Sequence, residues 1–176
     1  MPETIKVGIL LPVYKGDTLA FLECAINSLL NQTYSNISIF IGIDGPVGEN
    51  LLTRINEFSA KSDVRIVRFE KNRGLAAVLN DLLDICLKEK IDYIARMDAD
   101  DISVGNRIQK QLDFLLSHPE VDVVGGRIEE INEQSKRNGK TITYPLTHQE
   151  CFKFFRYRDP LAHPAVMFRK SFFDKV

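Results

Sequence analysis

The sequence predicts an α/β fold in three layers, with a mainly parallel central sheet between helices. Short apolar runs rich in β-forming residues alternate along the chain with segments whose apolar residues recur at helical spacing. The apolar runs are continuous, as in strands that are buried on both faces. Strands joined through helices form right-handed crossovers and therefore parallel pairs. A length of 176 residues fits a single domain.

The first half of the chain contains four predicted strands and three predicted helices. The strands are expected at 6–13, 37–44, 63–70 and 92–98. The helices between them are expected at 17–32, 50–61 and 75–88. Each helix has one apolar face, made of Leu19, Leu22, Ile26 and Leu29 in the first, Leu51, Ile55 and Phe58 in the second, and Leu75, Leu79, Leu82 and Cys86 in the third. Asp17 is expected to cap the first helix.

The second half continues the pattern less regularly. Its predicted elements are a helix at 106–118, a strand at 121–131, a polar loop at 132–140 and a strand at 165–169 that leads into a further helix. Thr147 and Glu150 have the spacing of a capping box, which predicts a short helix after Thr147.

Composition narrows the class of protein. Hydrophobic residues make up 44% and charged residues 27%, and the formal net charge is -1, so nothing indicates nucleic acid as a partner. No apolar run approaches the 18 or more residues of a membrane span, and the start of the chain lacks the pattern of a signal peptide. A cytoplasmic protein is therefore expected. The three cysteines, Cys24, Cys86 and Cys151, are predicted to be buried thiols.

Three carboxylates follow the fourth predicted strand. Residues two apart in an extended segment face the same side, so Asp98 and Asp100 should converge while Asp101 points elsewhere. Two converging carboxylates suit Mg²⁺ or Mn²⁺, with water and phosphate completing the coordination. The alternative is a solvated acidic turn.

Further polar groups are expected at the same edge of the sheet, because ligands bind beyond the carboxyl ends of parallel strands. Pro12, Val13 and Tyr14 end the first strand, and Asp44 ends the second. Arg73 lies in a basic loop before a predicted helix, where a helix N-terminus and a guanidinium could bind an anion.

Rival motifs fit less well. An EF-hand loop starting at Asp98 would need a ligand and a glycine where Ile102 and Ser103 stand. The segment "GIDGPVG" does not have the glycine spacing of a dinucleotide-binding loop. The closest competitor is the D-x-D-x-[TV] pattern of haloacid-dehalogenase-like phosphatases. That pattern is missed at Ile102, and in those enzymes it follows the first strand.

Five segments, in this order, resemble the motifs of glycosyltransferase family 2: "VGILLPVYKGD", "IGIDGP", "KNRGLAAVLN", "YIARMDADDIS" and "DPLAHPAVMFRK". The resemblance implies a GT-A fold and an inverting transferase that uses sugar nucleotides. It divides the single domain, 1–176, into a nucleotide-binding half at about 1–103 and the start of an acceptor-binding half at about 104–176.

The resemblance also implies roles for individual residues. Pro12, Val13 and Tyr14 would line the pocket of the nucleotide base, and Asp44 would hydrogen-bond the base or ribose. Arg73 would support the base or diphosphate. A Mn²⁺ or Mg²⁺ ion would bind Asp100 and Asp98, with Asp98 also near the ribose.

On the acceptor side, the resemblance implies that His163 could contact the acceptor or a phosphate. The catalytic base is expected beyond Val176. The implied donor is a nucleoside-diphosphate sugar, with uridine diphosphate first. The acceptor would be a saccharide or a lipid-linked glycan in cell-surface polysaccharide synthesis, at the inner face of a membrane and with peripheral membrane association. The alternatives are a non-catalytic nucleotide-sugar-binding fragment and the phosphatase.

Overall fold

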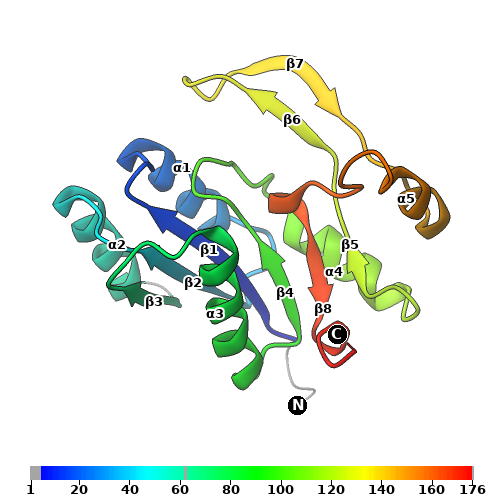
Figure 1. The fold of residues 1–176 in the computed structure, drawn as a ribbon, viewed down its shortest axis with the longest axis horizontal. Coiled ribbons are helices and arrows are strands. Elements are labelled where there is room, and N and C mark those ends of the chain that lie inside the picture. Colours follow the sequence, from blue (N-terminus) through cyan, green and yellow to red (C-terminus); the bar gives the residue numbers. More distant parts are fainter. Residues whose placement is uncertain (1–4, 62, 176) are drawn as a thin grey trace.

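The computed structural model describes residues 5–61 and 63–175 (Figure 1). Residues 1–4, on which the expected absence of a signal peptide partly depends, and Val176 lie outside the described residues. The elements are β1 (Val7–Tyr14), α1 (Leu19–Leu30), β2 (Ile37–Asp44), α2 (Glu49–Lys61), β3 (Val64–Phe69), α3 (Leu75–Lys88), β4 (Tyr93–Arg96), α4 (Arg107–Ser117), β5 (Val123–Val124), β6 (Ile128–Ile131), β7 (Arg137–Ile142), α5 (His148–Phe154), η1 (His163–Ala165), β8 (Met167–Arg169) and η2 (Lys170–Phe172).

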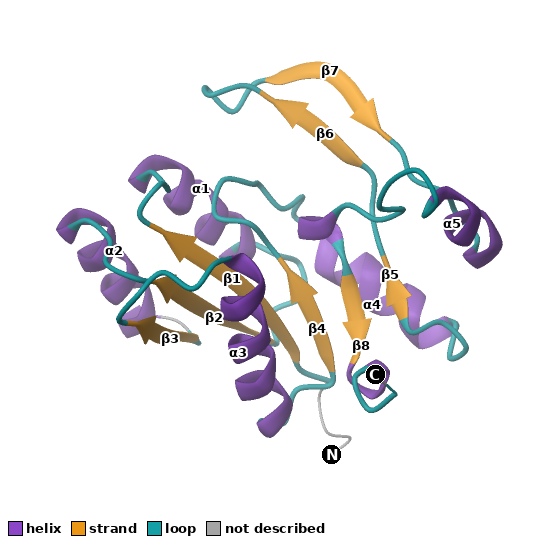
Figure 2. Ribbon diagram, viewed as in Figure 1, coloured by secondary structure: helices purple, strands orange, loops and turns teal. Residues whose placement is uncertain are grey.

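Six strands form the main sheet in the order β3-β2-β1-β4-β8-β5. The first four pair in parallel, and β8 runs antiparallel between β4 and β5 (Figure 2). Helices α1, α2 and α4 pack through one core on one face, and α3 packs through a second core on the other. This confirms the predicted mainly parallel sheet in three layers.

The strand β1 shows why the sheet is buried on both faces. Alternate side chains, Val7, Ile9, Leu11 and Val13, belong to the core under α1, α2 and α4. Leu10 faces the core under α3. Helix α3 approaches the sheet closely at Gly42, where an added Cβ would lie 2.5 Å from Cγ1 of Val78.

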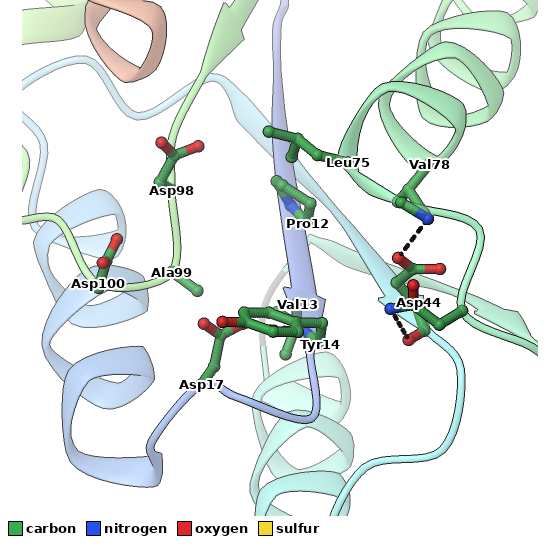
Figure 3. A pocket seen from close by; sticks show the side chains of 12 residues that line it. Pro12, Val13, Tyr14, Asp17, Asp44, Leu75, Val78, Asp98, Ala99 and Asp100 are labelled. Carbon is green, nitrogen blue, oxygen red and sulfur yellow. Dashed lines mark hydrogen bonds between the residues drawn. The ribbon is translucent and has the colours of Figure 1, made fainter.

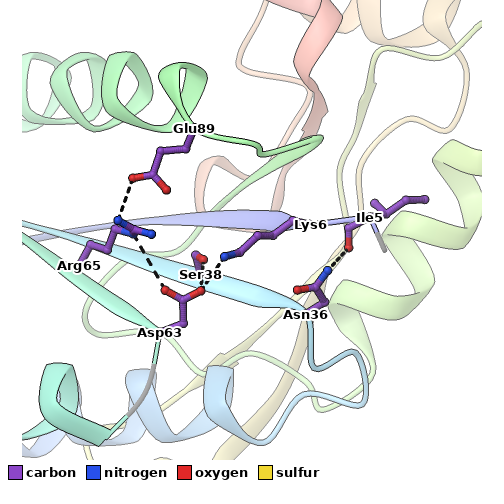
Figure 4. Close-up of polar contacts among 7 residues, drawn as sticks. All are labelled: Ile5, Lys6, Asn36, Ser38, Asp63, Arg65 and Glu89. Atoms are coloured by element: carbon purple, nitrogen blue, oxygen red, sulfur yellow. Dashed lines mark hydrogen bonds and ion pairs between the residues drawn. The ribbon is translucent and has the colours of Figure 1, made fainter. Parts of the chain in front are cut away.

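Polar contacts join the elements at the amino end of the sheet (Figure 4). The Asp63 carboxylate, at the start of β3, accepts hydrogen bonds from Lys6 Nζ and Ser38 Oγ. Arg65 pairs with Glu89 just after α3, at 3.1 Å. Such exposed pairs contribute little stability individually.

Two helix caps can be compared with their predictions. The capping box of Thr147 and Glu150 is confirmed. The cap of α1 is Thr18, whose side chain accepts from the Phe21 N–H, so the prediction for Asp17 was wrong. The Asp17 carboxylate instead accepts the Tyr14 N–H at 2.8 Å, which closes the turn before the helix.

The predicted strand at 121–131 is two strands in different sheets. β5 belongs to the main sheet, and β6 pairs with β7 in a second sheet. Gly125 and Gly126 lie between β5 and β6. The expected polar loop at 132–140 is confirmed at 132–136, the turn of the hairpin, whereas residues 137–140 belong to β7. The turn is held by Asn132 Oδ1, which accepts from the N–H groups of Gln134 and Lys136. The β6–β7 hairpin is mostly exposed, so its strands lack the apolar pattern of buried ones.

Three smaller expectations meet mixed outcomes. Cys86 is buried, but Cys24 is exposed and Cys151 half-buried. The helix expected after β8 is only the short 3₁₀ helix η2. Within residues 5–61 and 63–175, no helix is both long and apolar enough to cross a membrane.

Candidate active site

A pocket of about 410 Å³ lies at the carboxyl ends of the parallel strands. Parallel pairing brings Tyr14, at the end of β1, beside Asp44, at the end of β2. Beyond β4 the Met97 N–H donates to Leu10 O, which keeps the following carboxylates next to β1. The pocket is lined by Pro12, Val13, Tyr14, Asp17, Asp44, Asn72, Gly74, Leu75, Val78, Asp98, Ala99 and Asp100 (Figure 3).

Six of the eight candidate residues line this pocket: Pro12, Val13, Tyr14, Asp44, Asp98 and Asp100. Arg73 and His163 are not in its lining. Figure 3 shows Asp98 and Asp100 on one side and Asp44 on the other, with Pro12 and Tyr14 between them.

The Asp44 side chain is buried and holds the loop before α3. Its two oxygens accept the backbone N–H groups of Arg73, at 2.6 Å, and of Gly74, at 3.0 Å. Asn72 donates to the Asp44 carbonyl oxygen at 3.3 Å. Gly74 has a φ of +84°, in the region that favours glycine. The position of the pocket wall formed by Gly74 and Leu75 therefore depends on this carboxylate. The sequence did not indicate this structural role of Asp44.

The Arg73 side chain lies away from the pocket. Its guanidinium pairs with Asp81 on α3 and lies 5.1 Å from the centre of the Phe69 ring. Its backbone N–H donates to a pocket residue, Asp44. In this arrangement the guanidinium is committed to α3 rather than presented to a diphosphate.

Besides Asp44, three carboxylates line the pocket, and a further one, Asp101, lies close to two of them in the sequence. Asp17 joins Asp98 and Asp100 in the lining, and burial and the charges of those two aspartates raise its pKa. Burial also raises the pKa of Asp98, against the attraction of Arg96. Asp101 is outside the lining, and burial, with Asp98 and Asp100, raises its pKa to about 6.

Two guanidinium groups lie behind these carboxylates. Arg96 is 5% exposed, and its Nη2 lies 3.5 Å from Asp98 Oδ1. Its Nε is buried and has no hydrogen-bond partner among the residues that the structure describes. Arg107 donates to the carbonyl oxygens of Arg96, at 2.8 Å, and Val166, at 3.3 Å, and burial lowers its pKa to about 10. These cations offset part of the negative charge, and the sequence analysis missed both.

The imidazole of His163 is held by Arg96. Nη1 of Arg96 contacts Nδ1 of His163, in the 3₁₀ helix η1. A guanidinium can only donate, so Nδ1 must accept and the proton of the neutral ring must be on Nε2. Burial, followed by the charge of Arg96, lowers the pKa of His163, which favours this neutral form.

The carboxylates suit a partly open cation site. Among the described residues no group of three or more His, Cys, Asp or Glu side chains has the arrangement of a complete metal site. Asp98 and Asp100 nevertheless present carboxylate oxygens to one side of the pocket. Mg²⁺ and Mn²⁺ are commonly held by one or two carboxylates, with water and substrate phosphates filling the other positions. The donor set therefore fits such an ion.

Comparison with known proteins places these features in a family. A family model described as "Glycosyl transferase family 2" matches residues 9–176. The amylovoran biosynthesis glycosyltransferase AmsE of Erwinia amylovora is 35% identical over 169 residues, which are 96% of this chain and 60% of AmsE. A UDP-Gal:alpha-D-GlcNAc-diphosphoundecaprenol beta-1,3-galactosyltransferase of Escherichia coli is 30% identical, over 96% of this chain and 60% of that protein.

Solved structures show the same fold. TarS 1-349 of S. aureus, in complex with UDP-GlcNAc, matches with a TM-score of 0.73 at 14% identity, covering 97% of this chain and 47% of TarS 1-349. The mannosyltransferase PcManGT of Pyrobaculum calidifontis, in complex with GDP-Man and Mn²⁺, matches with a TM-score of 0.69 at 13% identity, covering 99% and 47%. The chain thus has a GT-A fold and spans about 60% of the length of these two curated relatives.

Proposed function

This chain belongs to glycosyltransferase family 2, and from that premise we propose that it takes part in moving a sugar from a nucleoside-diphosphate sugar to a saccharide or lipid-linked acceptor. The pocket at the carboxyl ends of β1, β2 and β4 carries this proposal. A uridine diphosphate sugar is the first candidate donor, since one similar protein is named for UDP-Gal and another was solved in complex with UDP-GlcNAc. Cell-surface polysaccharide synthesis at the inner face of a membrane is the proposed setting.

The nucleotide would lie between Tyr14 and the wall formed by Gly74 and Leu75. The Tyr14 ring is exposed at the end of β1 and offers a flat face for stacking on a base. Asp44, already bonded to two N–H groups, has further lone pairs for the base or ribose. The Arg73 guanidinium could contact a diphosphate only if its ion pair with Asp81 broke. We therefore propose that the main role of Arg73 is the hydrogen bond from its backbone N–H to Asp44.

Asp100 and Asp98 would hold a Mn²⁺ or Mg²⁺ ion beside the diphosphate. The ion would act as a Lewis acid that stabilises the negative charge of the leaving group. Asp17, which lines the same pocket, adds negative potential near the ion. Inversion requires the acceptor oxygen to attack from the side opposite the diphosphate, with a carboxylate as base. That base, expected beyond Val176, remains a prediction.

His163 would serve the acceptor side. Because Nδ1 accepts from Arg96, the donor of the neutral ring is Nε2–H, and such a donor can bind a hydroxyl or phosphate oxygen. Arg96 thereby links the carboxylate Asp98 to the acceptor-side imidazole.

The proposal is tested by thermal unfolding with UDP, GDP, ADP and CDP, each with and without Mn²⁺. A ligand at 100 times its dissociation constant adds about 2.7 kcal/mol, which for a domain of this size is a shift of about 5 to 11 °C. We expect one diphosphate to give this shift only with Mn²⁺, and Asp100→Ala to abolish it. Asp84→Ala, an exposed change on α3, should retain it.

Each failure identifies a different error. A full shift in Asp100→Ala would contradict the metal assignment, and no shift with any diphosphate in the folded parent would contradict the nucleotide site. A non-catalytic binding fragment would show the shift without sugar transfer, so turnover is measured with the matching sugar nucleotide and a diphosphoundecaprenol-linked acceptor.

A further inference from the structure

An exposed aromatic and basic surface surrounds α5. The segment 152–158 reads "FKFFRYR", four aromatic and three basic residues without an acid. No residue of α5 is buried. Phe152, Phe155 and Tyr157 are 69%, 71% and 86% exposed, and Leu146, just before the helix, is 94% exposed. We call this set, with Lys153, Arg156 and Arg158, the α5 surface.

The cations of the α5 surface are available for an external anion. Lys153, Arg156 and Arg158 are exposed and take part in none of the ion pairs among the described residues. The neighbouring acids are occupied locally: Glu150 accepts from Thr147 in the capping box, and Asp159 accepts the Leu161 N–H at 3.0 Å. The segment 152–158 thus carries three positive charges in a chain of net charge -1.

We propose that the α5 surface binds the interface of an anionic phospholipid bilayer. At that interface the aromatic rings and the leucine can insert among the lipid acyl chains, while lysine and arginine contact the lipid phosphates. A second copy of the chain fits less well, because a two-fold contact would set the same three cations against each other. The charge and the apolar exposure together therefore favour lipid over self-association.

The α5 surface is connected to the candidate acceptor side. The chain leaves α5 and reaches η1, where His163 contacts Arg96 beside the carboxyl end of β4 (Figure 1). A bilayer bound at α5 would bring a lipid-linked acceptor toward that side of the pocket. This link to the acceptor rests on the proposed function, whereas bilayer binding itself can be tested without it.

The test is sedimentation of the 176-residue chain with vesicles of phosphatidylcholine mixed with phosphatidylglycerol, and with vesicles of phosphatidylcholine alone. We expect binding to the anionic vesicles that weakens with added salt. The variant Lys153→Gln/Arg156→Gln/Arg158→Gln should bind about 100-fold more weakly, at about 5-fold for each cation. Phe152→Ser/Phe155→Ser should also bind at least about 10-fold more weakly.

Control variants remove exposed cations or an exposed apolar side chain elsewhere on the surface. Arg65→Gln/Arg68→Gln/Lys88→Gln removes three exposed cations on β3 and α3, and Leu30→Ser changes an exposed leucine on α1; both should bind like the parent. All variants are first checked for cooperative unfolding.

Three results would overturn the proposal. They are a parent that does not bind anionic vesicles, α5-surface variants that bind like the parent, and a dimer in light scattering that Phe152→Ser/Phe155→Ser dissociates. A diphosphate-induced thermal shift without vesicle binding would refute this surface while leaving the proposed nucleotide site intact.

Discussion

Asp98, Asp100 and Asp101 can lie within four residues because the protein places cations behind them. Arg96 lies beside Asp98, and the charge of Arg107 acts on both Asp98 and Asp101. Both arginines are held by neighbouring strands and loops: the Arg96 N–H donates to Val166 O, and Arg107 donates to Arg96 O. The compensation is incomplete, because Asp17 and Asp100 add negative charge on the pocket side. The remaining charge is what a divalent cation would neutralise.

Asp101→Asn should flatten the pH dependence of stability. Burial, with Asp98 and Asp100, raises the pKa of Asp101 from 3.8 to about 6. The folded carboxyl therefore binds its proton more tightly than the unfolded one. Its stabilising contribution is complete below about pH 4 and is lost as the pH rises through about 6. With a chelator present to remove metal ions, urea titration should show the free energy of unfolding falling more in the parent than in the variant between about pH 4 and about pH 6.

The control for this change is Asp84→Asn, on the exposed face of α3, which should keep the parent's slope. Equal slopes for the parent and Asp101→Asn would show that Asp101 titrates alike in the folded and unfolded chain.

Arg96→Met should allow the neutral imidazole of His163 to adopt either tautomer. In the parent, the contact with Arg96 makes Nδ1 an acceptor and places the proton on Nε2. Without the guanidinium, both tautomers become accessible. The ¹⁵N chemical shifts of the imidazole measure this directly. His118 is the internal control: its Nδ1 lies 2.9 Å from the carbonyl oxygen of Phe114, so it should be the Nδ1–H tautomer in both proteins. An unchanged His163 spectrum would contradict the positioning role of Arg96.

At the scale of elements, α3 connects the second core to the pocket. Its apolar face packs on β1 and β2 through Val78, Leu79 and Leu82. Its first turn supplies Leu75 and Val78 to the pocket wall. Any displacement of α3 from the sheet should therefore be felt both in stability and in nucleotide binding.

Gly42→Ala should displace α3. The added Cβ would lie 2.5 Å from Val78 Cγ1 and 3.0 Å from Leu82 Cδ1, closer than packed atoms allow. Such overpacking typically costs about 1–3 kcal/mol. We expect a lower midpoint in urea and a smaller thermal shift with the bound diphosphate. Gly48→Ala is the matched control, since no atom of residues 5–61 and 63–175 lies within 4 Å of its added Cβ. Equal stability of the two variants would show that α3 can relax without cost.

Elements with buried faces were predictable, and exposed ones were not. The predicted bounds of 37–44 and 75–88 agree with β2 and α3, because burial imposes a clear apolar pattern. The hairpin was missed because β7 is polar on both faces, and its strand state depends on pairing with β6. Apolar periodicity carries no information about such a strand.

The candidate site divides in the same way. The six lining residues that were predicted lie at or just beyond strand ends, where parallel topology makes a meeting point predictable. Asp17, Asn72 and Leu75 come from turns and a helix start, whose positions depend on tertiary contacts such as the Asp44 bonds. Arg96 was hidden in the sequence because it sits inside an apolar strand.

At the scale of the whole molecule, the β6–β7 hairpin is a separate two-stranded sheet that stands away from the main one (Figure 2). Neither hydrophobic core includes a residue of the hairpin, and none of its residues lines the pocket. Its ion pairs, such as Lys140 with Glu130, join the two hairpin strands to each other. The main sheet and the candidate nucleotide site should therefore be independent of it.

Excision of the hairpin tests this independence. Ile128 and Ile142 are cross-strand partners, so a short glycine–serine linker can replace residues 129–141. Because almost no apolar surface would be lost from the core, the free energy of unfolding should change by no more than about 1 kcal/mol. The diphosphate-induced thermal shift should also be retained. In the parent, hydrogen exchange should be fast in β6 and β7 and slow in β1 and β2. A large loss of stability on excision, or strong protection in the hairpin, would mean that it folds as one unit with the main sheet.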